Sequence, residues 1–494
     1  MEIKLLQRET PVWLTGDIVH KQVSFHAETV VPDTAEDAQE IVWTKGGLLL
    51  KGKEPGLHAV TITGEAWASI FYLSETGKLE CIRLRKDIEI VFDAETAEPD
   101  ALPHLSWYLS AVQGRLLNPR KLGVSFEVQA VVRSFQRGTV LTETALPEGE
   151  RRGLHILQEQ KAALVLSSVS EKPFTLREQL PLSDRQTALT RIDAEELRFD
   201  LQGTEQIGSR CIVKGELRLL LWGRNAAGLP ANTEFRISLS QLLDITEDTL
   251  DQSSIWIEPN SVYLDWTEGS GEARSLDLEL HALLQFCALS QRDVTLVTDA
   301  YSSAMPLAAE SSEHTLLVVE KDGSCVLSAD AALAVPDDLA EMLASEAKLG
   351  DLERSDTNAQ LPLYLDFLYR RADGSLAAAR RSTKLSVSDL PEDAILLSQR
   401  VKYAAVRREE GELRIDAEAE ILWHQEKTEQ ISTLSLLTLD EESAWKKTES
   451  PSVYLVRRGG ESLWDLAKDY RSSVDLIRSN NPENADLLLI PAEI

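Results

Sequence analysis

Residues 453–491 read VYLVRRGGESLWDLAKDYRSSVDLIRSNNPENADLLLIP, and this stretch has the most specific pattern of turns, caps and core positions in the chain. Tyr454 and Val456 fall on one face of a short strand, because side chains of a strand alternate between its two faces. A glycine-containing turn follows, and the hydroxyl of Ser462 can accept a hydrogen bond from a free backbone N–H at the start of a helix. The segment therefore predicts a strand that turns directly into a capped helix.

Apolar spacing extends this pattern. Four residues recur at i, i+3, i+4 and i+7 and share one helical face: Leu463, Leu466, Ala467 and Tyr470. Ser473 is placed to cap a second helix that turns Leu476 and Ile477 inward, and Asn480–Pro482 is a helix-ending sequence. A second strand at 487–491 closes the unit, so the sequence predicts a β-α-α-β module.

The module resembles the LysM family of binding modules, and residues 452–494 are expected to form such a domain. The resemblance implies a groove for a partner protein or a glycan, and it places nine residues there: Gly459, Gly460, Glu461, Ser462, Leu463, Trp464, Asn480, Asn481 and Pro482. For Trp464, packing in the core of the module and contact with the partner are both open alternatives.

The sequence departs from the LysM pattern in two loops. The loop between Val456 and Gly460 is one residue longer than usual, and Glu483–Asp486 replaces the usual Gly-Gln. In glycan-binding members these loops frame the groove that holds N-acetylated sugars. The departures argue against peptidoglycan binding and leave the expected fold unchanged.

A unit of about 150 residues occurs three times before this module. Each copy has a short strand-like segment and a glycine at constant spacing from it: Ile62–Ala66 with Gly77, Val213–Leu217 with Gly228, and Leu361–Leu363 with Gly374. Each copy opens near a proline: Val31–Asp33, Leu180–Pro181 and Val335–Asp337. Each ends in a long alternation of apolar and polar residues: 124–132, 276–286 and 413–423. Such alternation predicts antiparallel strands with one face in water.

These patterns predict a mainly β fold with minor α content. The expected division is three tandem β-rich domains, a polar linker and the C-terminal module: 10–150, 151–305, 306–427, 428–451 and 452–494. Gly64 and Gly215 are expected to form equivalent turns in the first two copies. The third copy should diverge most, because Leu361 replaces that glycine and the segment from Pro336 to Leu361 is short. Short helices are expected at 103–112 and 155–165.

Tandem repeats followed by a LysM module resemble the clostridial spore-coat morphogenetic proteins of the SipL family, whose repeats are SPOCS domains. The resemblance implies three SPOCS-like domains and a LysM module that docks to the stage IV sporulation protein A, a coat-basement ATPase. It also implies a cytoplasmic location in the mother cell, at the forespore surface. The alternatives are a protein that binds peptidoglycan or another N-acetylglucosamine glycan, and an enzyme whose site lies in a repeat.

Composition limits the classes of partner. The formal net charge of −30 repels nucleic acid and anionic membrane surfaces, and no apolar run approaches the length of a membrane span. Nucleic acid binding and membrane insertion are therefore not expected. The four cysteines lie far apart, which predicts reduced and mostly buried thiols, and the charged N-terminal residues do not read as a signal peptide.

No catalytic, cofactor-binding or metal-binding residues are expected. Residues 47–54 approach the phosphate-binding loop pattern, but Glu54 stands where the metal-binding serine or threonine is needed, and a strand is the better prediction. The histidines are scattered and no cysteine has a local partner of the kind that activates a nucleophile. The sequence therefore favours a modular, non-enzymatic adaptor.

Overall fold

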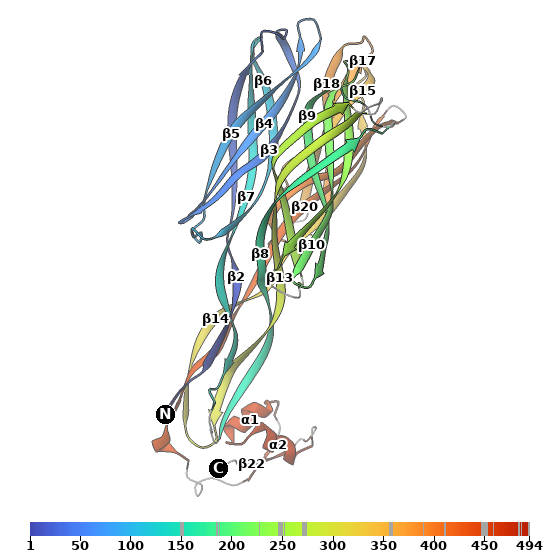
Figure 1. Cartoon of the computed structure of the whole chain (residues 1–494). Coiled ribbons are helices and arrows are strands. Elements are labelled where there is room, and N and C mark those ends of the chain that lie inside the picture. Colours follow the sequence, from blue (N-terminus) through green and yellow to red (C-terminus); the bar gives the residue numbers. More distant parts are fainter. Residues whose placement is uncertain are drawn as a thin grey trace.

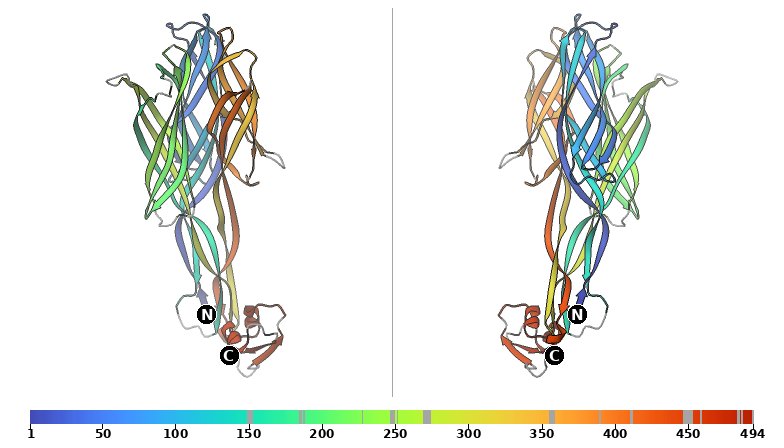
Figure 2. Two further views of the ribbon diagram at one scale, coloured as in Figure 1. Left: turned by 90° about the vertical axis from the view of Figure 1, so that its right-hand side faces the viewer. Right: turned by 90° about the vertical axis from the view of Figure 1, so that its left-hand side faces the viewer.

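A computed structural model describes residues 1–148, 153–183, 186, 188–226, 228–245, 250, 252–268, 274–354, 359–388, 390–409, 412–445, 453–457, 459–482, 485 and 487–492. In this part of the chain most residues lie in strands, and the two α-helices lie near the C-terminus. Three β-rich lobes occupy one end of the molecule, a narrow stalk follows, and a small C-terminal unit lies at the tip of the stalk (Figures 1 and 2). The prediction of a mainly β fold with minor α content is confirmed.

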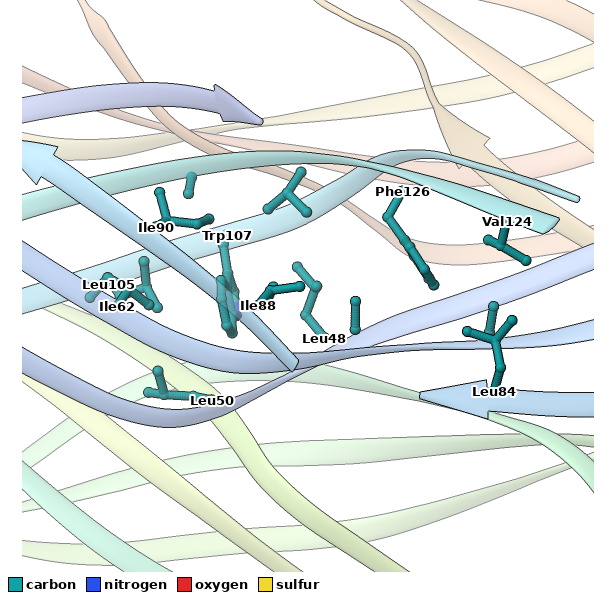
Figure 3. Close-up of a cluster of buried hydrophobic side chains, with 14 of the residues drawn as sticks. Leu48, Leu50, Ile62, Leu84, Ile88, Ile90, Leu105, Trp107, Val124 and Phe126 are labelled. Carbon is teal, nitrogen blue, oxygen red and sulfur yellow. The ribbon is translucent and has the colours of Figure 1, made fainter. Parts of the chain in front are cut away.

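In each lobe a small antiparallel sheet packs on three facing strands, two of which continue out of the lobe. In the first lobe the small sheet is β3 (Ala38–Gly56), β4 (Ala59–Ser74) and β5 (Leu79–Asp93). The facing strands are β2 (Leu6–Val30), β6 (Leu102–Asn118) and β7 (Lys121–Ala145). Alternate side chains of both sheets, such as Ile62, Trp107 and Phe126, meet between them and form a core (Figure 3).

The second and third lobes repeat this arrangement, each with its own core. In the second, β9 (Arg191–Ile207), β10 (Arg210–Arg224) and β11 (Pro230–Asp244) pack on β8 (Leu154–Pro181), β12 (Gln252–Glu268) and β13 (Arg274–Ser302). In the third, β15 (Leu339–Leu349), β16 (Glu353–Arg354), β17 (Ala359–Arg371) and β18 (Leu376–Val387) pack on β14 (Leu307–Ala334), β19 (Ile395–Glu409) and β20 (Glu412–Leu439).

The landmark glycines fall in two kinds of place. Gly77, Gly228 and Gly374 lie in equivalent turns, with φ of +76°, +74° and +88° that a side chain would strain. Gly64 and Gly215 do not form turns, contrary to the prediction. They lie inside β4 and β10, opposite register shifts in the neighbouring strand, and a side chain at Gly64 would collide with the ring of Trp107.

The third copy differs at the position of this glycine. Leu361 lies in β17, and the strand facing it is broken into β15 and β16 rather than bulged. The N–H of Gly350 donates to the carbonyl of Pro362 at 2.8 Å across the break. A break therefore replaces the bulge that a glycine accommodates in the other two copies.

The predicted helices at 103–112 and 155–165 are wrong, because both segments lie in strands, β6 and β8. Residues 103–107 are buried on both faces of β6, so they lack the alternation that reveals a strand. Residues 47–54 lie in β3, as the strand prediction required. The four cysteines are free and buried, which agrees with the predicted thiols.

Six long strands continue past the lobes and form the stalk, as three two-stranded ribbons: β2 with β7, β8 with β13, and β14 with β20 (Figure 1). Leu141, Val294 and Ile431, one from each ribbon, meet in a shared core inside the stalk. The predicted linker from residue 428 is therefore wrong for 428–439, which form the second half of β20 and pair with β14 and with β1 (Glu2–Lys4). A 3₁₀ turn at Glu441–Ser443 follows.

The three lobes pack around a common axis. Phe71, Trp222 and Leu368 hold the same position in the three copies, and all three lie in one core between the lobes. Lys45, Glu196 and Glu346 also hold equivalent positions, on β3, β9 and β15. The lobes are therefore joined through a shared centre as well as through the stalk.

Candidate functional site

The C-terminal unit, called the head below, comprises the described residues from 453 to 492. Its elements are β21 (Val453–Arg457), α1 (Leu463–Asp469), α2 (Val474–Asn480) and β22 (Leu487–Pro491). The two strands pair antiparallel, and one face of their sheet packs on the helices through Tyr454, Val456, Leu488 and Ile490. The predicted order of strand, helix, helix and strand is confirmed for these residues.

Local hydrogen bonds cap the first turn of each helix where the sequence predicts. The Ser462 hydroxyl accepts from the N–H of Asp465 at 3.1 Å, and the Asp465 carboxylate accepts from the N–H of Ser462, which completes a capping box. Ser473 caps α2 through the N–H of Leu476 at 3.2 Å. Ile477 points inward as predicted, whereas Leu476 is half exposed and Val474 packs inward instead.

The residues assigned to the groove fall into two loops. Gly459, Gly460, Glu461 and Ser462 are exposed; Gly460 has a φ of +109°, and Glu461 accepts from the N–H of Gly459 at 2.9 Å. Leu463 is half buried and packs in the head core.

On the second loop, Asn480 donates to the carbonyl of Leu476, and Pro482 is exposed. Asn481 bonds both the N–H and the carbonyl of Leu489 at 2.7 Å, which ties the loop to β22. In the loop that differs from the LysM pattern, Glu483–Asp486, three residues lie outside the described part of the chain: Glu483, Asn484 and Asp486.

Trp464 lies between the head and the stalk. Its Nε1 donates to Oδ2 of Asp299 on β13 at 2.8 Å, and its ring packs against the Tyr301 ring in an edge-to-face arrangement with ring centres 4.9 Å apart. Lys468 on the next turn of α1 pairs with the same carboxylate at 2.7 Å. Burial raises the pKa of Asp299, but the hydrogen bonds from Lys468 and Trp464 outweigh it and hold this pKa below its ordinary value.

Tyr301 completes the contact between head and stalk. It is buried in the head core, and its hydroxyl donates to the carbonyl of Ser472 at 2.7 Å. His155 of β8 stacks on the same ring, with ring centres 4.8 Å apart. We call Asp299, Tyr301, Trp464, Lys468 and Ser472 the clasp. Asp299 and Tyr301 were not expected at the site, because no local pattern links residues so distant in sequence.

Replacing Tyr301 by alanine is expected to release the head from the stalk. The change removes a buried ring and its hydrogen bond, a loss of about 3 kcal/mol for a large aromatic side chain. Spin labels at Glu159→Cys on the stalk and Asp469→Cys on α1 should report one narrow distance in the parent chain and a broad distribution in the variant.

Tyr263→Ala, at a tyrosine 62 % exposed on β12, is the matched control for this release. The control should leave the distance narrow. An unchanged narrow distance in Tyr301→Ala would contradict the clasp.

The outer face of the head sheet is apolar and exposed. Four aliphatic side chains lie on it, Val453 at 49 %, Leu455 at 66 %, Leu487 at 52 % and Leu489 at 38 % of full exposure. The helices cover the opposite face of the same sheet, and they also carry the head's share of the clasp. The apolar face is thus directed away from the stalk. Contiguous exposed apolar side chains of this kind mark interaction surfaces.

A second candidate site is a cavity of about 340 Å³ on the axis between the lobes. Segments of all three copies line it, and its charges are largely paired: Lys45 bonds Glu346 at 2.5 Å and Glu196 at 2.6 Å. Burial raises the pKa of Glu258 to about 8, although a hydrogen bond from Trp107 and the charge of Lys53 oppose the shift. The ion pairs of Lys45 therefore link the first lobe to the second, through Glu196, and to the third, through Glu346.

Among the described residues, no group of three or more His, Cys, Asp and Glu side chains is arranged to hold a metal ion. Neither α-helix of the described chain is long and apolar enough to cross a membrane. No family model, curated protein or solved structure matches this chain.

Proposed function

We propose that this chain is a non-enzymatic adaptor of spore-coat assembly, with three SPOCS-like domains and a LysM head that docks to a coat-basement ATPase of the stage IV sporulation protein A type. The protein would then act in the mother-cell cytoplasm at the forespore surface. The observation that carries the proposal is the exposed apolar face of the head, Val453, Leu455, Leu487 and Leu489, at the far end of a long stalk.

The position of the head supports a docking role. The clasp fixes the head on the stalk tip, so a partner held on the apolar face would be held at a set direction from the lobes. The lobes at the other end then stand away from the docked surface and are available to other coat components (Figure 2). This geometry suits a spacer that joins two layers.

The alternative function is binding of peptidoglycan or another N-acetylglucosamine glycan through the head. Glycan grooves place aromatic rings where a sugar can stack on them. The one tryptophan assigned to the groove, Trp464, is occupied by Asp299 and Tyr301 of the stalk. The protein-docking proposal therefore has the better support.

A truncated chain that ends after Thr448 tests the proposal. We expect the full chain to bind the purified ATPase in biolayer interferometry and the truncated chain to lose at least a hundredfold in affinity, because the apolar face is gone. Circular dichroism and the urea unfolding midpoint should show that the truncated body stays folded, since each lobe has its own core.

Two results would count against docking through the head. The first is equal affinity of the ATPase for the full and truncated chains. The second is co-sedimentation of the full chain with purified peptidoglycan in the absence of ATPase binding, which would support the glycan alternative.

A further inference from the structure

The two edges of the head sheet, formed by β21 and β22, differ in whether their outward backbone N–H and carbonyl groups are already hydrogen-bonded. Leu455 lies opposite Leu489 in the antiparallel ladder, and both the N–H and the carbonyl of Leu489 bond the side chain of Asn481. Leu489 therefore directs its backbone groups away from β21, and the Leu455–Leu489 pair is one of the pairs that exchange no hydrogen bonds. By the same alternation, Leu455 directs its own N–H and carbonyl away from β22.

The outer edge of β22 is closed. Asn481 occupies the groups of Leu489, Pro491 has no N–H to offer, and the carbonyl of Pro491 accepts from the Ser472 hydroxyl at 2.5 Å. These contacts occupy the outward backbone groups of Leu489 and Pro491, so another strand cannot pair with them.

The outer edge of β21 is open. The head sheet has two strands, and within the described residues no hydrogen bond reaches the outward N–H and carbonyl groups of Val453 and Leu455. The same two residues carry exposed aliphatic side chains. Proteins normally protect such an edge with charge, proline or a covering segment, because it pairs readily with other strands. Among the residues that the structure describes, such contacts cover the outward backbone groups of β22 and not those of Val453 and Leu455.

We propose that β21 receives an extended strand of the docked partner at this open edge, with aliphatic partner residues at alternate positions beside Val453 and Leu455. The inference rests on the proposed function and specifies how the head holds its partner. In this mode of recognition main-chain hydrogen bonds supply affinity and alternate side chains supply specificity.

The size of the apolar face favours a strand over a second folded surface. A stable interface between two folded proteins takes about 20–30 residues on each side. The apolar face has four exposed side chains, Val453, Leu455, Leu487 and Leu489. A strand of a few residues gains its binding energy from the backbone of β21 and needs only this small face to cover its side chains.

The test compares two substitutions at one position in the full chain. Leu455→Ala removes the side chain and keeps the N–H, and Leu455→Pro removes both. Proline is tolerated at such a site because the lost N–H is not part of the β21–β22 ladder. With the purified ATPase, alanine should weaken binding about threefold to tenfold, and proline should weaken it at least tenfold more. The narrow distance between labels at positions 159 and 469 checks that the head of each variant remains in place.

Amide exchange in the unmodified chain provides a second measurement that needs no variant. The outward amide of Leu455 should exchange quickly in the free protein and at least tenfold more slowly in the complex. The amide of Val456, which faces β22, should be protected in both states and serves as the control.

The possible outcomes distinguish a failure of strand addition from a failure of docking through the head. Equal affinity of the two Leu455 variants, or an unprotected Leu455 amide in the complex, would overturn strand addition while head docking stands. Binding that survives truncation after Thr448, or no binding by the full chain, would overturn both. A dimer of the free chain in light scattering that Leu455→Pro abolishes would mean that the edge pairs with a second copy, which also contradicts the partner strand.

Discussion

Replacing Lys45 by methionine is expected to lower the free energy of unfolding by about 3 kcal/mol, because it leaves the buried carboxylate of Glu346 and the partly buried carboxylate of Glu196 without their shared cation. The Lys45 side chain is 1 % exposed and lies 2.5 Å from Glu346 and 2.6 Å from Glu196. Its ammonium also sits 3.7 Å from the centre of the Trp222 ring. Methionine has a similar volume to lysine, so the decrease in the free energy of unfolding comes mainly from the missing charge and not from a cavity.

Neighbouring cations limit this loss. Arg198 still pairs with Glu196 at 2.5 Å, and Lys348 still pairs with Glu346 at 2.8 Å. The expected effect therefore lies at the lower end of the range for a broken buried pair, which is about 3–5 kcal/mol.

The matched control is Lys384→Met. Lys384 pairs with Glu353 at 2.7 Å with both side chains more than half exposed. Surface pairs contribute about 0–1 kcal/mol, so this change should move the urea midpoint little. Adding Glu346→Gln to Lys45→Met should recover part of the loss by removing one uncompensated charge. Equal losses from the two lysine substitutions would contradict the role of Lys45 at the shared centre.

Replacing Glu258 by glutamine is expected to make the chain more stable at pH 9 by about 3–5 kcal/mol and to change little at pH 5. Burial raises the pKa of Glu258 to about 8 in the folded chain, from 4.5 in the unfolded chain. Between these values the folded chain holds a proton that the unfolded chain has lost. The stability linked to this proton is complete below pH 4.5 and declines as the pH rises toward 8. Glutamine has no proton to lose.

Urea unfolding at pH 5, 7 and 9 measures this difference. Glu178→Gln, at an exposed glutamate on β8, is the control and should follow the parent chain at every pH. A parent chain and a Glu258→Gln variant whose stabilities stay parallel from pH 5 to pH 9 would show that Glu258 keeps an ordinary pKa.

The parts of the fold that the sequence predicts are those whose signals are local. The head was predicted because Ser462, Ser473 and Asn481 fix its turns within a few residues. The strands at 124–132, 276–286 and 413–423 were predicted because each has one buried face in its lobe, which makes polar and apolar residues alternate. A single buried face is the condition under which period-two patterns appear.

The parts that the sequence does not predict depend on contacts between distant segments. Residues 103–107 are buried on both faces, so their sequence predicts a helix; residues 428–439 carry mixed polarity inside a narrow stalk, so their sequence predicts a linker. The clasp joins Trp464 to Asp299, and the axis joins Lys45 to Glu196 and Glu346. The spacing of residues along the sequence does not predict these pairings, because each partner is a polar or aromatic residue with no distinguishing pattern in its own segment.

Electron microscopy of the chain bound to the purified coat-basement ATPase would show directly whether the head is the docking end. The molecule has its lobes at one end and the head at the other, so the two ends can be distinguished in single particles (Figure 1). We expect ATPase density at the tip of the stalk, against the head, with the three lobes free at the opposite end. ATPase density on the lobes, with the head uncovered, would contradict it.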